Sequence, residues 1–181
     1  DIETVELEMD NILSEFQKET TQNMSSKFRL ILKDLLTLSK SQESLKSETE
    51  QIPRNSPGLH DLALKQQMIQ NQLTQAMENA VSLSKETFLV SPMMGRMLGS
   101  AYAQMNVSKG KLAERNGNGS IDNQDEAIIA LNEGSKIIIQ SIKQMQESGS
   151  ASGYNQFLKQ LEQMAGKQQG INNQGMQLAL G

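Results

Sequence analysis

The sequence predicts an all-α protein in which elongated antiparallel helical hairpins pack as a coiled-coil-like bundle. Apolar residues recur at alternating steps of three and four over long stretches, which is the period of a helix with one buried face. None of these stretches shows the alternation with a period of two that is typical of strands. Segments that contain proline and glycine separate them, as turns between helices do.

The composition suits a bundle with narrow buried seams and a largely hydrated surface. Only 36% of the residues are hydrophobic and 3% are aromatic, so a core must come from Leu, Ile, Ala and 11 Met. The net charge of −4 comes with no basic run, which argues against nucleic acid or an anionic lipid surface as the main partner. No apolar run approaches the roughly 18 residues of a membrane span. The absence of cysteine excludes disulfides and fits the cytoplasm or the periplasm.

The first predicted helix spans about residues 2–51. In its middle the apolar residues follow one another at steps of four, a stutter that unwinds a supercoil locally without interrupting the helix. The alternative is a break at 20–26, where Thr, Asn and Ser weaken the helix propensity. The predicted seam consists of Ile2, Val5, Met9, Ile12, Phe16, Thr20, Met24, Phe28, Ile31, Leu35, Leu38, Gln42, Leu45, Thr49 and Ile52.

Two prolines and a glycine in 53–58 end this helix. Ser56-Pro57 has the chemistry of an N-cap and a first helical position, so a second helix is predicted to begin there, to end near Thr87 and to pack antiparallel on the first. Its predicted seam is Leu62, Gln66, Ile69, Leu73, Ala76, Ala80 and Leu83.

Ser91-Pro92 repeats this cap chemistry and predicts a sharp joint, after which a third helix runs from Pro92 to about Arg115. Gly95 and Gly99 fall one turn apart on one face, so we expect the fourth helix to pack closely there. The predicted seam of the third helix is Met94, Leu98, Ala101, Met105, Ser108 and Leu112.

The segment 116–119, Asn-Gly-Asn-Gly, predicts a turn because both residue types tolerate positive φ. Ser120 or Asp122 is expected to cap the fourth helix, and its additional isoleucines, Ile129, Ile137 and Ile139, are expected to reach a second neighbour. Its predicted seam is Ile128, Leu131, Ser135, Ile138, Ile142 and Met145.

A Ser- and Gly-rich break at 148–153 precedes a short predicted fifth helix and a weakly ordered tail at 167–181. The apolar residues of the fifth helix are Tyr154, Phe157, Leu158, Leu161, Met164 and Ala165. The chain is therefore predicted to divide into a long hairpin at 1–87, a second hairpin at 88–148, and the remaining segment at 149–181.

No pattern of residues predicts catalysis, a cofactor or a metal site. His60 is the only histidine and has no cysteine beside it, so it is interpreted as a surface residue at a helix start. A calcium loop that began at Asn116 would have Ile121 where glycine is required and Ala127 where glutamate is required. We therefore expect no enzymatic activity.

Four methionines of the third helix, Met93, Met94, Met97 and Met105, offer three interpretations. Their spacing places several of them on the seam, which favours core packing. Exposed methionines can also form an adaptable surface for a protein partner, and thioethers can bind Cu(I). Core packing is favoured over the partner face, and the partner face over the metal.

Three stretches resemble an uncharacterised family of large, membrane-anchored, Gln- and Met-rich bacterial proteins that carry a domain of unknown function. The matching stretches are Phe88-x-Val90-Ser91-Pro92-x-x-Gly95-Arg96-x-Leu98-Gly99, Ala130-Leu131-Asn132-Glu133, and Met164-Ala165-Gly166-x-Gln168-Gln169-Gly170-Ile171-Asn172. The resemblance implies transmembrane helices before Asp1 and further helical sequence after Gly181. Because the chain opens at Asp1 without Met or a signal peptide, we expect it to be a piece of a longer protein.

The sequence thus predicts a non-catalytic helical scaffold segment of a bacterial cell-envelope protein, in the periplasm, with the cytoplasm as the alternative compartment. Its expected partners are proteins, either copies of itself in a homo-oligomer or other helical segments, and membranes only through flanking segments. The alternative function is a helper that binds a client or an export substrate in a Met-rich groove.

Overall fold

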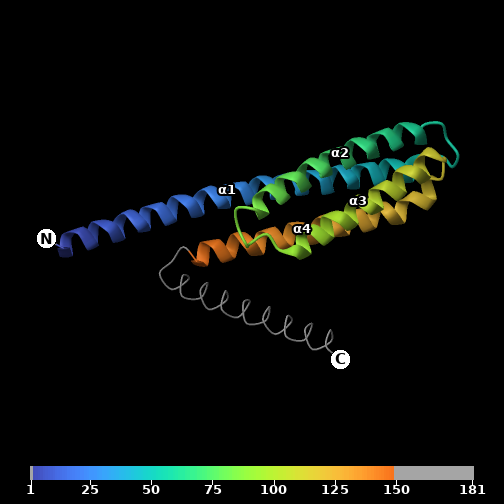
Figure 1. Ribbon diagram of the computed structural model, residues 1–181. Helices are drawn as coiled ribbons and strands as arrows, with labels where there is room; N and C mark the ends of the chain where they lie inside the picture. Colours follow the sequence, from blue (N-terminus) through green and yellow to red (C-terminus); the bar gives the residue numbers. More distant parts are fainter. Residues whose placement is uncertain (1, 149–181) are drawn as a thin grey trace, which may run out of the picture. The chain divides into compact units, whose positions relative to one another are not determined.

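The computed structural model describes residues 2–148, and in that range it contains four helices and no strand (Figure 1). The all-α prediction is confirmed. The helices are α1 (Ile2–Gln51), α2 (Leu59–Ser84), α3 (Pro92–Ala113) and α4 (Gly117–Ser148). The predicted fifth helix and tail, within 149–181, lie outside the described residues. The division at 87 and 148 stays a prediction.

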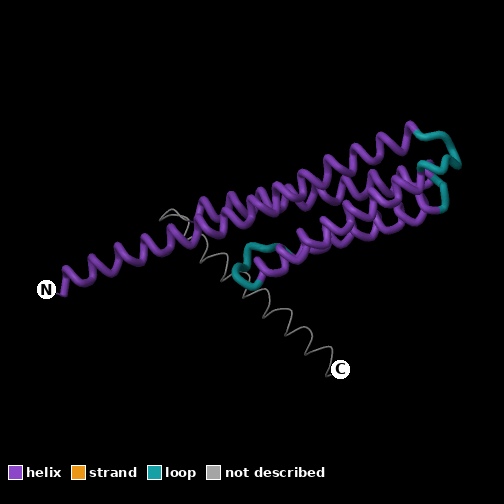
Figure 2. The backbone as a smooth tube through the Cα atoms, turned by 90° about the horizontal axis from the view of Figure 1, so that it is seen from above, coloured by secondary structure: helices purple, strands orange, loops and turns teal. Residues whose placement is uncertain are grey.

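The chain separates into two compact units, one of Ser25–Ile142 and one of Asp1–Met24 with Lys143–Gly181. Within the larger unit, consecutive helices run antiparallel and lie side by side (Figures 1 and 2). Each helix also has polar contacts with two neighbours, which closes the bundle. These contacts pair Lys65 with Glu48, Lys109 with Gln67, Lys111 with Asn123, and Lys46 with Asp125.

Helix α1 is continuous through 20–26, so the predicted single helix is confirmed and the alternative of a break is wrong. Its seam is buried inside the larger unit, from Phe28 to Thr49, as predicted. The buried seam residues there are Phe28, Ile31, Leu35, Leu38, Gln42, Leu45 and Thr49. The predicted seams of α2 and α3 are likewise buried at every position.

The N-terminal half of the α1 seam differs from the prediction, because Ile12 and Phe16 are 65% and 67% exposed. Four residues make slightly more than one helical turn, so every step of four rotates the apolar row by about 40° around the helix. Four such steps separate Ile12 from Phe28. The row therefore winds away from the core-facing side of α1, and these two side chains emerge in solvent.

The predicted start of α2 is wrong by two residues. The helix begins at Leu59, with Gly58 as its N-cap and no capping side chain. The Ser56 hydroxyl accepts a hydrogen bond from the backbone N–H of Gly58 at 3.2 Å, and the N–H groups of Leu59 and His60 bond to the carbonyls of Ser56 and Pro57. Ser56 and Pro57 thus form a tighter turn of 3₁₀ type that precedes the α-helix.

The predicted joint at Ser91-Pro92 is confirmed. Ser91 has an extended conformation (φ −65°, ψ 135°), and its side chain accepts a hydrogen bond from the N–H of Met93 at 3.2 Å. Pro92 is the first residue of α3, where its missing N–H leaves no hydrogen bond unmade. The chain reverses direction between Ser84 and Pro92, which makes α2 and α3 an antiparallel pair.

The cap of α4 differs from both predicted candidates, Ser120 and Asp122. Helix α4 begins at Gly117, and the Asn116 side chain caps it by accepting the Gly119 N–H at 2.9 Å. Ser120 is instead buried inside the helix, where its hydroxyl donates to the Gly117 carbonyl at 2.6 Å. Asparagine is as good an N-cap as serine or aspartate, so residue type alone does not select among these candidates.

The glycines of this segment provide space rather than positive φ. A Cβ atom on Gly117 would lie 2.9 Å from Cδ2 of Leu59, and one on Gly119 would lie 2.4 Å from the Asn116 side chain. No glycine among the described residues has a positive φ, and the left-handed residue of this turn is Arg115, with φ 60°. The predicted turn exists, but it lies one or two residues earlier than predicted.

The expectation that extra isoleucines broaden the buried face of α4 is wrong for Ile129 and Ile139, which are 55% and 39% exposed. Helix α4 packs in the core through Leu131, Ile138, Ile142 and Met145, and it comes close to two neighbours at Gly134. A Cβ on Gly134 would lie 3.3 Å from Cδ2 of Leu98 on α3 and 3.6 Å from Cδ1 of Leu35 on α1.

Candidate interaction surfaces

Three buried polar side chains of the bundle core, Gln42, Gln66 and Ser108, hydrogen-bond to one another. Gln42 and Gln66 exchange two hydrogen bonds: Nε2 of Gln42 donates to Oε1 of Gln66 at 2.9 Å, and Nε2 of Gln66 donates to Oε1 of Gln42 at 2.7 Å. The Ser108 hydroxyl also donates to Oε1 of Gln66, at 3.1 Å. All three residues are fully buried, so this cluster joins α1, α2 and α3 internally.

The ion pairs of the described residues lie at the surface of the bundle. A hydrogen bond to Asp125 raises the pKa of Lys46. Nζ of Lys46 lies 2.7 Å from Oδ1 of Asp125, and this ion pair links α1 to α4. His60 is exposed at the second position of α2, as predicted. Among the described residues, no group of three or more His, Cys, Asp or Glu side chains is placed to hold a metal ion. Within the same range, no helix has the length and apolar character of a membrane span.

The four methionines of α3 do not share one exposed face, which the alternative interpretation as a partner face would need. Met94 and Met105 are 1% and 0% exposed and belong to the core, whereas Met93 is 43% exposed and Met97 is half-buried beside Gly134 of α4. Positions three and four apart share a helix face only approximately, so the four side chains diverge around α3. The packing interpretation therefore holds for Met94 and Met105.

The prediction that Gly95 and Gly99 let α4 approach α3 is also wrong. A Cβ atom added at either glycine would have no neighbour within 4 Å. These glycines share the face of α3 that carries Tyr102, whose backbone carbonyl accepts a hydrogen bond from Gln70 of α2. The sequence indicated that the glycines share a face, but it did not indicate which helix lies beside that face.

Replacing Gly99 by Ala is therefore expected to stabilise the protein by about 0.5–1 kcal/mol, because alanine has the higher helix propensity and its Cβ meets no atom. Thermal melting checks this. The matched control is Gly119→Ala, whose Cβ would displace the Asn116 cap, so we expect no gain there. A lower melting temperature for Gly99→Ala than for the wild type would restore the packing hypothesis.

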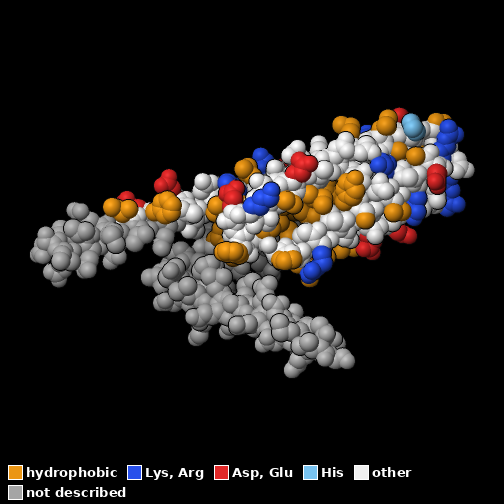
Figure 3. Space-filling model, in the orientation of Figure 1, with side chains coloured by type: hydrophobic (Ala, Val, Ile, Leu, Met, Phe, Trp, Pro, Cys, Tyr) orange, Lys and Arg blue, Asp and Glu red, His pale blue; other side chains and the backbone are white. Residues whose placement is uncertain are grey.

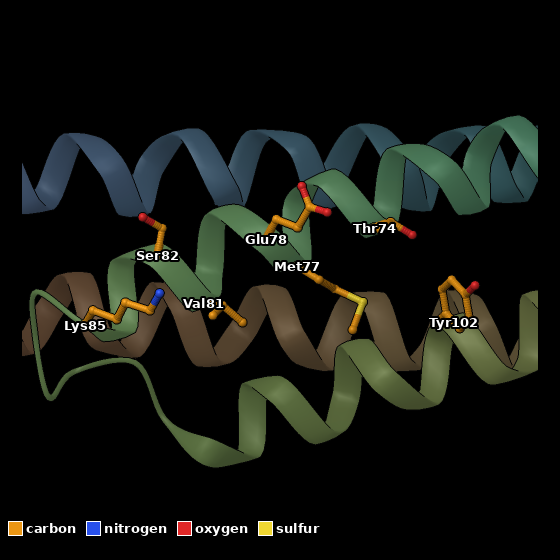
Figure 4. Close-up of a pocket in the computed structure, with 7 residues that line it drawn as sticks. All are labelled: Thr74, Met77, Glu78, Val81, Ser82, Lys85 and Tyr102. Carbon is orange, nitrogen blue, oxygen red and sulfur yellow. The ribbon is translucent and has the colours of Figure 1, made fainter.

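A groove of about 460 Å³ lies between α2 and α3 (Figure 4). Figure 4 shows Met77 pointing from α2 toward α3, with Lys85 at one end of the groove and Tyr102 at the other. Val81 and Tyr102 are 58% and 41% exposed. In Figure 3, hydrophobic side chains gather over this region. The groove residues are Thr74, Met77, Glu78, Val81, Ser82, Lys85 and Tyr102.

The glycines explain why the groove is open. Hydrogen bonds from Lys109 to Gln67 and from Gln70 to Tyr102 fix the antiparallel register of α3 on α2. In that register the stretch from Gly95 to Gly99 lies along Thr74–Glu78. A Cβ added at Gly95 or Gly99 would meet no atom within 4 Å, and Tyr102 is the α3 residue that lines the groove. Val81 and Tyr102 are apolar residues outside the predicted seams, so their positions in the sequence were the signal for an apolar groove.

A second surface runs along the solvent side of α1, and its members recur at multiples of seven residues. Ile12, Glu19, Lys33 and Lys40 form one such series, and Glu15, Arg29 and Leu36 form another. We call these residues, together with Phe16, the outer face of α1. All of them are exposed, and Leu36 is 51% exposed. Figure 3 shows hydrophobic and acidic side chains together on the N-terminal half of α1.

The half of α1 before Met24 has Glu15 and Glu19 beside its apolar residues, with the exposed Lys18 between them. In the half after Ser25, three cationic residues and the exposed Leu36 line a shallow depression of about 370 Å³. Its lining residues are Arg29, Leu32, Lys33, Leu36, Thr37 and Lys40.

Comparison with known proteins gives no relative: no family model, no curated protein and no solved structure matches this chain.

Proposed function

We propose that the chain is a non-catalytic helical scaffold that binds protein partners through the outer face of α1. The observation that carries this proposal is the exposure of Ile12 and Phe16, which lie one turn apart on a helix that is continuous with the bundle core. An isolated helix is only marginally stable in water, and large exposed apolar side chains on it are stabilised when a partner covers them.

The compartment proposed is the bacterial cell envelope. Its support is the resemblance of the stretch from Phe88 to Gly99 and of the two shorter motifs to membrane-anchored bacterial proteins. The Ser91-Pro92 joint inside the first motif is a structural element that separates α2 from α3. A segment with this role suits a scaffold, because it fixes the antiparallel direction of two helices and provides no reactive group.

The test places a photo-crosslinking amino acid at Phe16 in the full-length protein in living bacteria. We expect crosslinks to protein, recovered with the envelope fraction. The matched control is the same probe at Leu64, which is 56% exposed on α2 outside both candidate surfaces. Equal crosslinking at both positions, or recovery of the crosslinked species in the cytosol, would contradict the proposal.

The second candidate is a helper that binds a client peptide, and the groove between α2 and α3 favours it. An amphipathic helix docks into grooves of this kind through apolar anchors one turn apart. Met77 and Val81, one turn apart on α2, give the groove an apolar wall for such anchors, and Lys85 and Glu78 also line the groove. Replacing Gly99 by Leu would fill the groove from the α3 side, so it should abolish client binding without lowering the melting temperature.

A further inference from the structure

The part of α1 that belongs to the larger unit carries a row of cations without ion-pair partners. Arg29, Lys33 and Lys40 are exposed, and none of them forms an ion pair within the described part of the chain. They follow one another at steps of four and seven residues, so they project from one side of the helix. Among the described residues, none of those that line the depression beside them is acidic. This side of α1 is therefore locally positive, although the net charge of the chain is −4.

Leu36 lies among these cations and is 51% exposed. Lys33 precedes it by three residues and Lys40 follows it by four, so both are its neighbours on the helix surface. Leu32, which is half-buried, lies one turn before Leu36. The depression thus combines apolar side chains with cations and exposes both to a partner.

Helix α4 adds an apolar side chain to this surface. Two polar contacts join α1 to α4 at positions that are seven residues apart on both helices. They are Ser39 with Asn132 and Lys46 with Asp125. Because residues seven apart recur on nearly the same side of a helix, the same spacing places Leu32 of α1 opposite Ile139 of α4. Ile139 is 39% exposed, so the apolar surface extends from α1 across to α4.

We propose that this surface binds an acidic amphipathic helix of a partner protein. The proposal rests on the proposed function and specifies the chemistry of the partner. We call the surface the cationic patch, and its residues are Arg29, Leu32, Lys33, Leu36, Lys40 and Ile139. Carboxylates of the bound helix pair with the three cations, and apolar side chains on the same helix cover Leu36 and Ile139. The patch from Arg29 to Lys40 is about 17 Å long at 1.5 Å per residue, which corresponds to about three turns of a bound helix.

The arrangement of the patch favours a protein helix over an anionic membrane or a nucleic acid. A helix that lies on a membrane inserts a continuous apolar face, whereas cations precede and follow Leu36 along the same side of α1. Insertion of Leu36 would bring Lys33 and Lys40 toward the apolar layer, where a charge is costly. A nucleic acid would pair its phosphates with the cations but would offer little cover to Leu36 and Ile139. An acidic amphipathic helix is complementary to both kinds of side chain.

The first test measures the binding of two fluorescent synthetic helices to the full chain by fluorescence anisotropy. The acidic peptide has three heptads with leucine at each d position and glutamate at each e and g position, and the basic peptide has lysine in place of glutamate. We expect the chain to bind the acidic peptide at least about tenfold more tightly than the basic one. Attraction by the net charge of −4 would favour the basic peptide instead. A preference for the basic peptide, or no preference, would overturn the proposal.

Charge reversal in the patch should reverse this preference. Lys33→Glu/Lys40→Glu is expected to weaken binding of the acidic peptide more than about tenfold and to make the basic peptide the tighter ligand. A variant with a merely loosened structure would lose both peptides. The matched control, Lys85→Glu/Arg96→Glu, makes the same change in net charge at the α2–α3 groove and at an exposed position of α3. Equal weakening by the control would mean that the peptide binds elsewhere than the patch, and the proposal would be wrong.

The second test places a photo-crosslinking amino acid at Leu36 in the full-length protein in living bacteria. We expect a crosslink to a protein segment rich in Asp and Glu, which mass spectrometry of the crosslinked peptide identifies. A crosslink to a basic or uncharged segment, a crosslink to lipid or nucleic acid, or no crosslink would overturn the proposal. If the Phe16 probe still captures an envelope protein in any of these cases, the scaffold function stands although the acidic helix is not its partner.

Discussion

Phe28→Ala is expected to lower the free energy of unfolding by about 3–5 kcal/mol, whereas Phe16→Ala should change it by less than about 0.5 kcal/mol. Both residues lie on α1, but the Phe28 side chain is fully buried and the Phe16 side chain is 67% exposed. Removal of a buried ring leaves a cavity in the core, while removal of an exposed ring leaves only solvent.

Urea unfolding, followed by circular dichroism at a protein concentration low enough to keep the chain monomeric, measures both changes. The Phe16 variant is the matched control, because it removes the same atoms from the same helix. Equal destabilisation by the two substitutions would mean that Phe16 is buried within its own chain, and the outer face of α1 would lose its proposed role.

Gln66→Leu has the second large expected effect, a loss of about 2–3 kcal/mol of stability. The substitution leaves the amide of Gln42 and the hydroxyl of Ser108 buried without their partner. An unsatisfied buried polar group costs more than its hydrogen bond contributes in the folded protein, because its hydration is lost on folding. The Gln42→Leu variant should show a similar loss.

The double variant Gln42→Leu/Gln66→Leu separates this explanation from simple overpacking. When both glutamines become apolar, neither leaves the other unsatisfied, so most of the lost stability should return. A double variant that loses the sum of the two single effects would show that packing, rather than hydrogen bonding, makes this position sensitive.

The periodicity of the sequence predicted the core of the larger unit well, because burial there follows the helical repeat. Every predicted seam position of α2 and α3 is buried, including the polar residues Gln66 and Ser108. The cap at Ser91 was predicted from the proline that follows it, although the same dipeptide at Ser56-Pro57 forms a turn of 3₁₀ type before α2. These features depend on neighbours in the sequence.

The wrong predictions concern features that depend on neighbours in space. Gly95 and Gly99 suggested close packing, but the glycine that is close to two other helices is Gly134 on α4. The glycines at 117 and 119 suggested positive φ, but they make room for Leu59 and for the Asn116 cap. A glycine at any of these positions has the same sequence signal, and only the packed structure shows which purpose it serves.

The outer face of α1 was partly accessible from the sequence. The winding caused by successive steps of four predicts that Ile12 and Phe28 cannot share one buried side. The recurrence of Glu15, Arg29 and Leu36 at multiples of seven was visible as well. The sequence alone does not show which side of α1 faces the bundle core, and so it does not show which side is exposed.

Amide hydrogen exchange along α1 tests the central claim, that association covers the outer face, most directly. The exchange is measured at low protein concentration and again at high protein concentration. Residues 25–51 should be protected at both concentrations, because the bundle buries their core-facing side. Residues 2–24 should exchange rapidly in the dilute protein and become protected in the concentrated protein. Protection of residues 2–24 that does not change with concentration, or that is absent at both concentrations, would contradict the claim.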